Sequence, residues 1–181
     1  KIIFDNNKMP TLLNYESLKD RLIILNGWSK TFCMTGWRLG WSIWPEKIIE
    51  HAIKLCVNDH SCPSAVSQYA GIEAIKGPQN YVNFIASEFQ KRRNFIYDKL
   101  NQLNNINCYK PGGAFYAFPN VSKSGLNGNE FAKEALEVHG VALVPGTSFG
   151  NNAIHNIRIS YANSLENIEK ATNRLKNIQV E

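Results

Sequence analysis

Two basic side chains lie in a short segment that is rich in glycine and aromatic residues. Lys30 comes shortly after the apolar run 21–25 and its Asn26-Gly27 turn, and Arg38 follows eight residues later. Desolvation of a lysine in such a place disfavours the ammonium form and lowers its pKa, which leaves an amine that can attack an aldehyde. A planar guanidinium nearby suits a phosphate group. The alternative is a solvated lysine at a strand end beside an arginine in a structural ion pair.

The elements that must position these residues can be predicted from the apolar pattern. An apolar, partly β-branched run predicts a strand at 21–25, and the alternation at 37–44 predicts a second one. Pro45 and Pro63 then open two helices, one from Glu46 to about residue 57 and one to about residue 75. The stop signal Lys76-Gly77-Pro78 predicts a domain boundary, so that residues 1–78 and 79–181 form separate domains.

The second half of the chain predicts a compact α+β domain with the order helix, two strands, helix, two strands, helix. The expected elements are a long amphipathic helix over 81–103, strands near 107–109 and over 114–119, a helix over 129–138, strands over 141–145 and 157–161, and a last helix that Asn163 or Ser164 caps. The charged run Lys91-Arg92-Arg93 is expected on the solvated face of the long helix.

Composition excludes several classes of protein. The 181 residues are 44% apolar and 19% charged, which suits a globular fold, and no apolar run approaches the ~20 residues of a membrane span. The net charge of +5 is scattered, so nucleic-acid binding is not expected. Four irregularly spaced cysteines indicate reduced thiols and a cytoplasmic protein. No His or Cys spacing matches a metal site.

Four motifs, in order along the chain, resemble those of one enzyme family. The longest is Ser29-Lys30-Thr31-Phe32-x-Met34-Thr35-Gly36-Trp37-Arg38-Leu39-Gly40, and it is followed by Lys110-Pro111-x-Gly113-Ala114-Phe115-Tyr116, Val144-Pro145-Gly146-x-x-Phe149-Gly150 and Ile157-Arg158-Ile159-Ser160-Tyr161-Ala162. Together they resemble the pyridoxal-phosphate-dependent class I aminotransferases of the aspartate aminotransferase type. The likeness runs from about residue 3 to about residue 176.

The resemblance implies a fold, a reaction and three site residues. The fold would be α/β, with the end of the large-domain sheet followed by the α+β small domain. Lys30 would form the internal aldimine with pyridoxal 5′-phosphate and then act as general base and acid. Arg38 would hold the cofactor phosphate, and Arg158 would clamp the substrate α-carboxylate. The implied reaction is transamination between an L-amino acid, with aspartate or an aromatic amino acid as candidates, and a 2-oxo acid, in a homodimer.

The chain also departs from the family pattern. Gly27 stands where many members carry a phosphate-binding serine, and nothing before Arg21 matches the family's pyridine-binding Asp or its glycine-rich phosphate loop. We therefore expect the chain to be the C-terminal half of an aminotransferase, with little or no activity alone. Two alternatives stay open: a pyridoxal-phosphate carbon–sulfur lyase on the same fold, and a non-catalytic small-domain remnant.

Overall fold

The computed structural model describes residues 2–178 of the chain, and these residues form two compact units. The first unit comprises residue 2 and residues 6–85, and the second comprises residues 3–5 and residues 86–178. The long helix α4 (Asn80–Asn101) begins in the first unit and continues into the second. The domain boundary expected after residue 78 remains a prediction about the whole protein.

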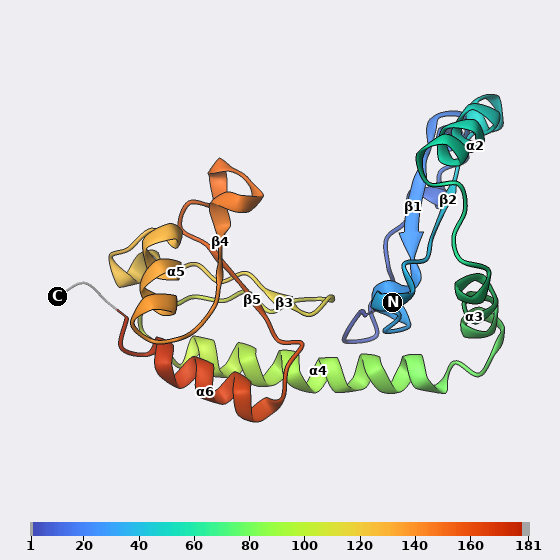
Figure 1. Cartoon of the computed structure of the whole chain (residues 1–181). Helices are drawn as coiled ribbons and strands as arrows, with labels where there is room; N and C mark the ends of the chain where they lie inside the picture. Colours follow the sequence, from blue (N-terminus) through green and yellow to red (C-terminus); the bar gives the residue numbers. More distant parts are fainter. Residues whose placement is uncertain (1, 179–181) are drawn as a thin grey trace. The chain divides into compact units, whose positions relative to one another are not determined.

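The first unit is a two-stranded ribbon with helices (Figure 1). Its regular elements are β1 (Ile24–Gly27), α1 (Trp28–Thr31), the 3₁₀ turn η3 (Thr35–Trp37), β2 (Gly40–Ile43), α2 (Glu46–His60) and α3 (Ala65–Lys76). Two further 3₁₀ segments, η1 (Leu12–Asn14) and η2 (Glu16–Arg21), precede them. β1 and β2 pair antiparallel, with Ile24 opposite Ile43 and Gly27 opposite Gly40. The α1–η3 connection therefore lies at one end of this ribbon.

The second unit is a three-stranded antiparallel sheet in the order β3-β5-β4, packed with three helices. Besides α4 it contains β3 (Tyr116–Ala117), α5 (Gly128–Glu137), β4 (Val144–Pro145), the turn η5 (Gly146–Phe149), β5 (Ile157–Ser160) and α6 (Leu165–Leu175), with short 3₁₀ turns at Ser122–Ser124 and Asn151–Ala153. α4 and α6 lie side by side, joined by a 2.7 Å ion pair between Lys99 and Glu169 (Figure 1).

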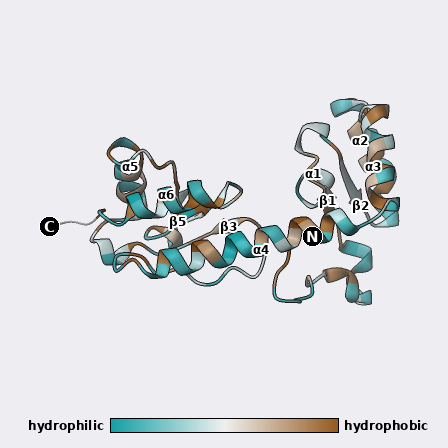
Figure 2. Ribbon diagram, turned by 90° about the horizontal axis from the view of Figure 1, so that it is seen from below, coloured by the Kyte–Doolittle hydropathy of each residue, from teal (hydrophilic) through white to brown (hydrophobic). Residues whose placement is uncertain are grey.

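The core of the second unit consists of side chains from every layer. Ile96 and Leu100 of α4, Phe131 of α5, Ile157 of β5 and Leu175 of α6 are almost fully buried. Figure 2 shows apolar and polar residues interleaved along α4, as the predicted amphipathic pattern requires. No helix within residues 2–178 combines the length and the apolar character needed to cross a membrane.

The element order agrees with the sequence-based prediction, whereas several strands are shorter or displaced. The first strand spans Ile24–Gly27 rather than 21–25, because residues 16–21 form a 3₁₀ helix. β3 and β4 have two residues each, and they pair with different halves of β5, β3 with Ile159 and Ser160 and β4 with Ile157 and Arg158. The strand expected near 107–109 is a single bridge between Asn107 and Asn120.

Candidate active site

Lys30 lies on α1, the single helical turn that follows β1. The turn is anchored by Trp28, whose backbone N–H donates to Leu39 O at 3.2 Å and whose indole Nε1 donates to Gly71 O at 3.0 Å. Trp28, Met34 and Leu39 form a buried apolar cluster. A Cβ at Gly71 would lie 2.4 Å from a methyl carbon of Leu39 and 3.3 Å from the Trp28 indole, so the glycine lets this cluster pack closely against α3 without a shift of Leu39. Local packing therefore fixes the backbone that carries Lys30.

The side chain of Lys30 is exposed in this chain, which corrects the expectation that it is desolvated. Trp28, two residues earlier, takes the buried position instead. Through Trp28 the turn packs against α3, whereas the Lys30 side chain lies on the solvent side of the described residues.

Arg38 lies at the same end of the ribbon as Lys30. Arg38 directly follows η3 and comes two positions before Gly40, which pairs with Gly27. Its backbone is left-handed, with φ 51° and ψ 48°, and this conformation is uncommon for residues other than glycine, asparagine and aspartate. Its Nη1 donates to Thr35 O at 2.9 Å.

Arg38 lines a hollow of about 780 Å³. The other lining groups are mostly polar or aromatic, and they include Asn26, Trp37, Trp41, Ser42, His60, Ser64 and Ser67. None of the ion pairs among the described residues uses Arg38. A guanidinium beside hydroxyl and amide groups is a suitable donor set for a phosphate. Lys30 does not line this hollow.

Arg158 belongs to the second unit, where it lies in the middle strand β5. It is half-buried, and its guanidinium carbon lies 4.5 Å from the ring centroid of Tyr116 and 4.8 Å from that of Phe149. No carboxylate among residues 2–178 forms an ion pair with it. Its N–H edge is thus available to an external carboxylate.

The aromatic partners of Arg158 were not identified from the sequence. Tyr116 and Phe149 lie in two of the motifs, but only the pairing of β3 with β5 and the path of the turn η5 show that they meet Arg158. The alternation of the segment 114–119 does place Tyr116 and Phe118 on one face of a strand. Which residue of β5 that face meets is a property of the register, which the alternation does not define.

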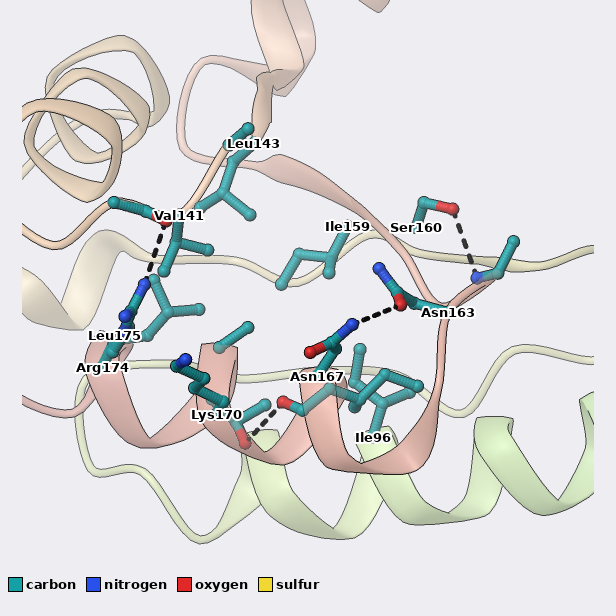
Figure 3. Close-up of a pocket in the computed structure, with 16 residues that line it drawn as sticks. Ile96, Val141, Leu143, Ile159, Ser160, Asn163, Asn167, Lys170, Arg174 and Leu175 are labelled. Atoms are coloured by element: carbon teal, nitrogen blue, oxygen red, sulfur yellow. Dashed lines mark hydrogen bonds between the residues drawn. The ribbon is translucent and has the colours of Figure 1, made fainter.

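A second hollow, of about 450 Å³, lies within the second unit beside α6 (Figure 3). Apolar side chains such as Val141, Ile159 and Leu175 line it, and Asn167 and Arg174 lie at its border, where they bond to Asn163 Oδ1 and Gly140 O. It contains none of the three predicted site residues.

Comparison with known proteins assigns the chain to a family. The family model of aminotransferase class I and II matches residues 4–175. The chain is 43% identical over 163 residues to an aspartate aminotransferase of Geobacillus stearothermophilus, covering 87% of this chain and 41% of that enzyme. It is 34% identical over 178 residues to aromatic-amino-acid aminotransferase 2 of Thermococcus litoralis, covering 97% and 46% of the two chains.

Solved structures agree with this assignment. The aromatic aminotransferase from Pyrococcus horikoshii superposes with a TM-score of 0.93 at 35% identity, over 98% of this chain and 48% of that one. The aspartate aminotransferase of Rhizobium meliloti gives 0.91 at 33% identity, over 98% and 46%. The chain belongs to the class I and II aminotransferase family, and its fold is that of the corresponding half of the aspartate aminotransferase fold. It spans less than half the length of these relatives.

Proposed function

We propose that the full-length protein transfers an amino group between an L-amino acid and a 2-oxo acid with pyridoxal phosphate as cofactor. The observation that carries the proposal is the β1–α1–η3–β2 ribbon end, where one fold element presents the Lys30 amine and Arg38, which joins none of the ion pairs among the described residues. The family match over residues 4–175 supports the same reaction.

The residues of the first unit fit the proposed cofactor by their chemistry. A primary amine can condense with an aldehyde, and Arg38, together with the hydroxyl and amide groups that line the same hollow, can take a phosphate. A Cβ at Gly27 would lie 3.1 Å from Leu39 O, so the glycine suits the close approach of the two strands but provides no hydroxyl. The phosphate contacts from this chain would therefore come from Arg38 and its neighbours in the hollow.

Each of the three basic residues then has a distinct task. Pyridoxal phosphate, when bound, supplies an aldehyde and a conjugated ring that draws electrons from the bonds at the substrate Cα. Arg38 binds the phosphate, which fixes the position of that ring. The Lys30 amine accepts and returns the proton at the substrate Cα. Arg158 binds the α-carboxylate through two parallel N–H groups, which orients the Cα–H bond.

The donor amino acid is proposed more broadly, as aspartate or an aromatic amino acid. The relatives at 43% and 34% identity are named for these two kinds of substrate. Both kinds share the α-carboxylate that Arg158 would bind, whereas their side chains differ in charge and shape. The proposal for Arg158 is therefore independent of the choice between them.

A homodimer in the cytoplasm is proposed for the whole protein. Large apolar side chains on α2 and α3 are exposed in this chain, among them Leu55 at 68% and Val66 at 70%. Patches of this kind require a cover from the same or another subunit. All four cysteines are free thiols, which supports a reducing compartment.

The test is an assay of the full-length protein. We expect glutamate to form from 2-oxoglutarate with aspartate or an aromatic amino acid as donor. Lys30→Ala should lower kcat by at least ~10²-fold, since it removes the proton-transferring amine. Lys47→Ala, at an exposed position of α2, is the matched control and should retain activity. Release of pyruvate and ammonia from cystathionine, without glutamate formation, would show a lyase and contradict the proposal.

A further inference from the structure

The side chains of β5 divide between two faces. Ile157 and Ile159 are buried in the core, whereas Arg158 and Ser160 lie on the opposite face and are half-buried and exposed. This alternation is what a strand with one covered face requires. Arg158 thus stands on the accessible face of the central strand, with a neighbouring strand on each flank.

Both flanks of β5 supply an aromatic ring to that face. β3 pairs with β5 so that Tyr116 lies opposite Ser160, which makes Tyr116 a diagonal neighbour of Arg158. On the other flank β4 pairs with β5 so that Val144 lies opposite Arg158, and the turn η5 that follows β4 ends at Phe149. The two rings therefore reach one guanidinium from opposite flanks of β5, one from the strand β3 and one from the turn after β4.

The distances indicate that the rings hold this guanidinium. Its central carbon lies 4.5 Å from the Tyr116 centroid and 4.8 Å from the Phe149 centroid, both inside the ~6 Å range of cation–π attraction. Phe149 is itself held by an edge-to-face contact with Phe118, with centroids 5.7 Å apart and an interplanar angle of 85°. A guanidinium held against rings keeps its coplanar N–H groups for partners at its edge.

We propose that Tyr116 and Phe149 are positioning residues that hold Arg158 ready for a substrate carboxylate. The inference rests on the proposed function, because it gives Arg158 the carboxylate as its ligand. Without the rings, the long arginine side chain would have to be ordered when the ligand binds. Ordering one such side chain weakens binding by roughly 2- to 13-fold. Arg158 would make the same contact with a substrate carboxylate and with an inert one. The clamp, by which we mean Tyr116 and Phe149 holding Arg158, therefore affects the affinity for both.

The experiment uses the full-length holoenzyme and two inert carboxylates, maleate and 3-phenylpropanoate, as competitive inhibitors. Of the two inhibitors, the one that binds the wild type more tightly is used for the comparison. Phe149→Leu and Tyr116→Leu should each raise its inhibition constant by roughly 2- to 13-fold, and they should raise the KM for 2-oxoglutarate by a similar factor. The change in kcat should be smaller. Tyr116→Phe and Phe149→Tyr keep an aromatic ring, so they should retain the wild-type inhibition constant and KM. Tyr109→Leu, at a residue that is 83% exposed, is the aromatic control and should change nothing.

A double-mutant cycle separates positioning from general loss of structure. In an Arg158→Ala background, Phe149→Leu should have no further effect on inhibitor affinity, because the group it positions is absent. Persistence of the full effect in that background would overturn the proposal. Since half of Phe149 is exposed, the Phe149→Leu variant is expected to fold. If Tyr116→Leu does not fold, the result for Phe149→Leu tests the proposal.

The outcomes also distinguish this inference from the proposed function. Suppose that Arg158→Ala weakens the binding of both inhibitors while Phe149→Leu and Tyr116→Leu leave it unchanged. In that case the proposal that the two rings hold Arg158 is wrong, and the role of Arg158 stands. If Arg158→Ala itself leaves both inhibitors unchanged, the role of Arg158 in the proposed function is wrong, and the clamp is overturned with it.

Discussion

Arg93 is the residue that departs most from the sequence-based expectation. It was expected on the solvated face of α4, yet its side chain is fully buried. Its Nη2 bonds to Asp5 Oδ1 at 2.7 Å, its Nη1 donates to Pro111 O at 2.6 Å, and its guanidinium lies 4.8 Å from the Phe4 centroid. The segment 3–5 therefore belongs to the second unit although it lies near the start of the chain.

This ion pair predicts a pH dependence of stability. The hydrogen bond from Arg93 lowers the pKa of Asp5 below its ordinary value of 3.8. A carboxyl group whose folded pKa is depressed stabilises the protein above its unfolded pKa, and this contribution is lost as pH falls through the folded pKa. Asp5→Asn should therefore lower Tm relative to wild type at about pH 7, and the difference should shrink below about pH 4.

The measurement is thermal unfolding of wild type and variant across that pH range. Asp20→Asn is the control, because Asp20 is exposed and forms no ion pair among the described residues. A Tm difference for Asp5→Asn that is constant from neutral to acidic pH would show that the charge of Asp5 does not matter.

Among the elements, α5 has the most sharply defined start. Asn127 caps it through bonds to the backbone N–H groups of Asn129 and Glu130, and the Glu130 carboxylate accepts from the Asn127 N–H at 2.9 Å. The first residue of the helix is Gly128, where a Cβ would lie 2.2 Å from Asn156 O. The helix start is thus pressed against the chain that leads into β5.

This close approach predicts that Gly128→Ala is destabilising. The added carbon must displace backbone, and overpacking of this kind costs about 1–3 kcal/mol. Gly112→Ala is the matched control, because a Cβ there meets nothing within 4 Å. Chemical denaturation of the full-length protein should show a lower midpoint for Gly128→Ala alone. Equal midpoints for the two variants would contradict the packing described here.

The helices were more predictable from the sequence than the strands. α2 and α6 begin at Glu46 and at Leu165 after its Ser164 cap, as local signals indicated, because proline and cap residues act within one turn. Strand limits depend on pairing across the chain, so β3 and β4 were overestimated. The same limit applies to the candidate site: the motifs predicted Lys30, Arg38 and Arg158, whereas the contacts of Tyr116 and Phe149 with Arg158 depend on the tertiary fold.

At the scale of the whole molecule, this chain corresponds to part of the fold of its relatives. The alignments with the two solved relatives include 98% of this chain but only 46–48% of each relative. Lys30 is exposed, and so are large apolar residues of α2 and α3. The role proposed for Lys30 is therefore to be tested on a full-length protein.

The central claim is that Lys30 is the amine that binds the cofactor. The most direct measurement is reduction of the cofactor-loaded full-length protein with borohydride, followed by digestion and mass mapping of the labelled peptide. We predict that the pyridoxyl group is found on Lys30, and that Lys30→Ala abolishes labelling whereas Lys47→Ala does not. Specific labelling of a different lysine, with Lys30 unmodified, would contradict the account.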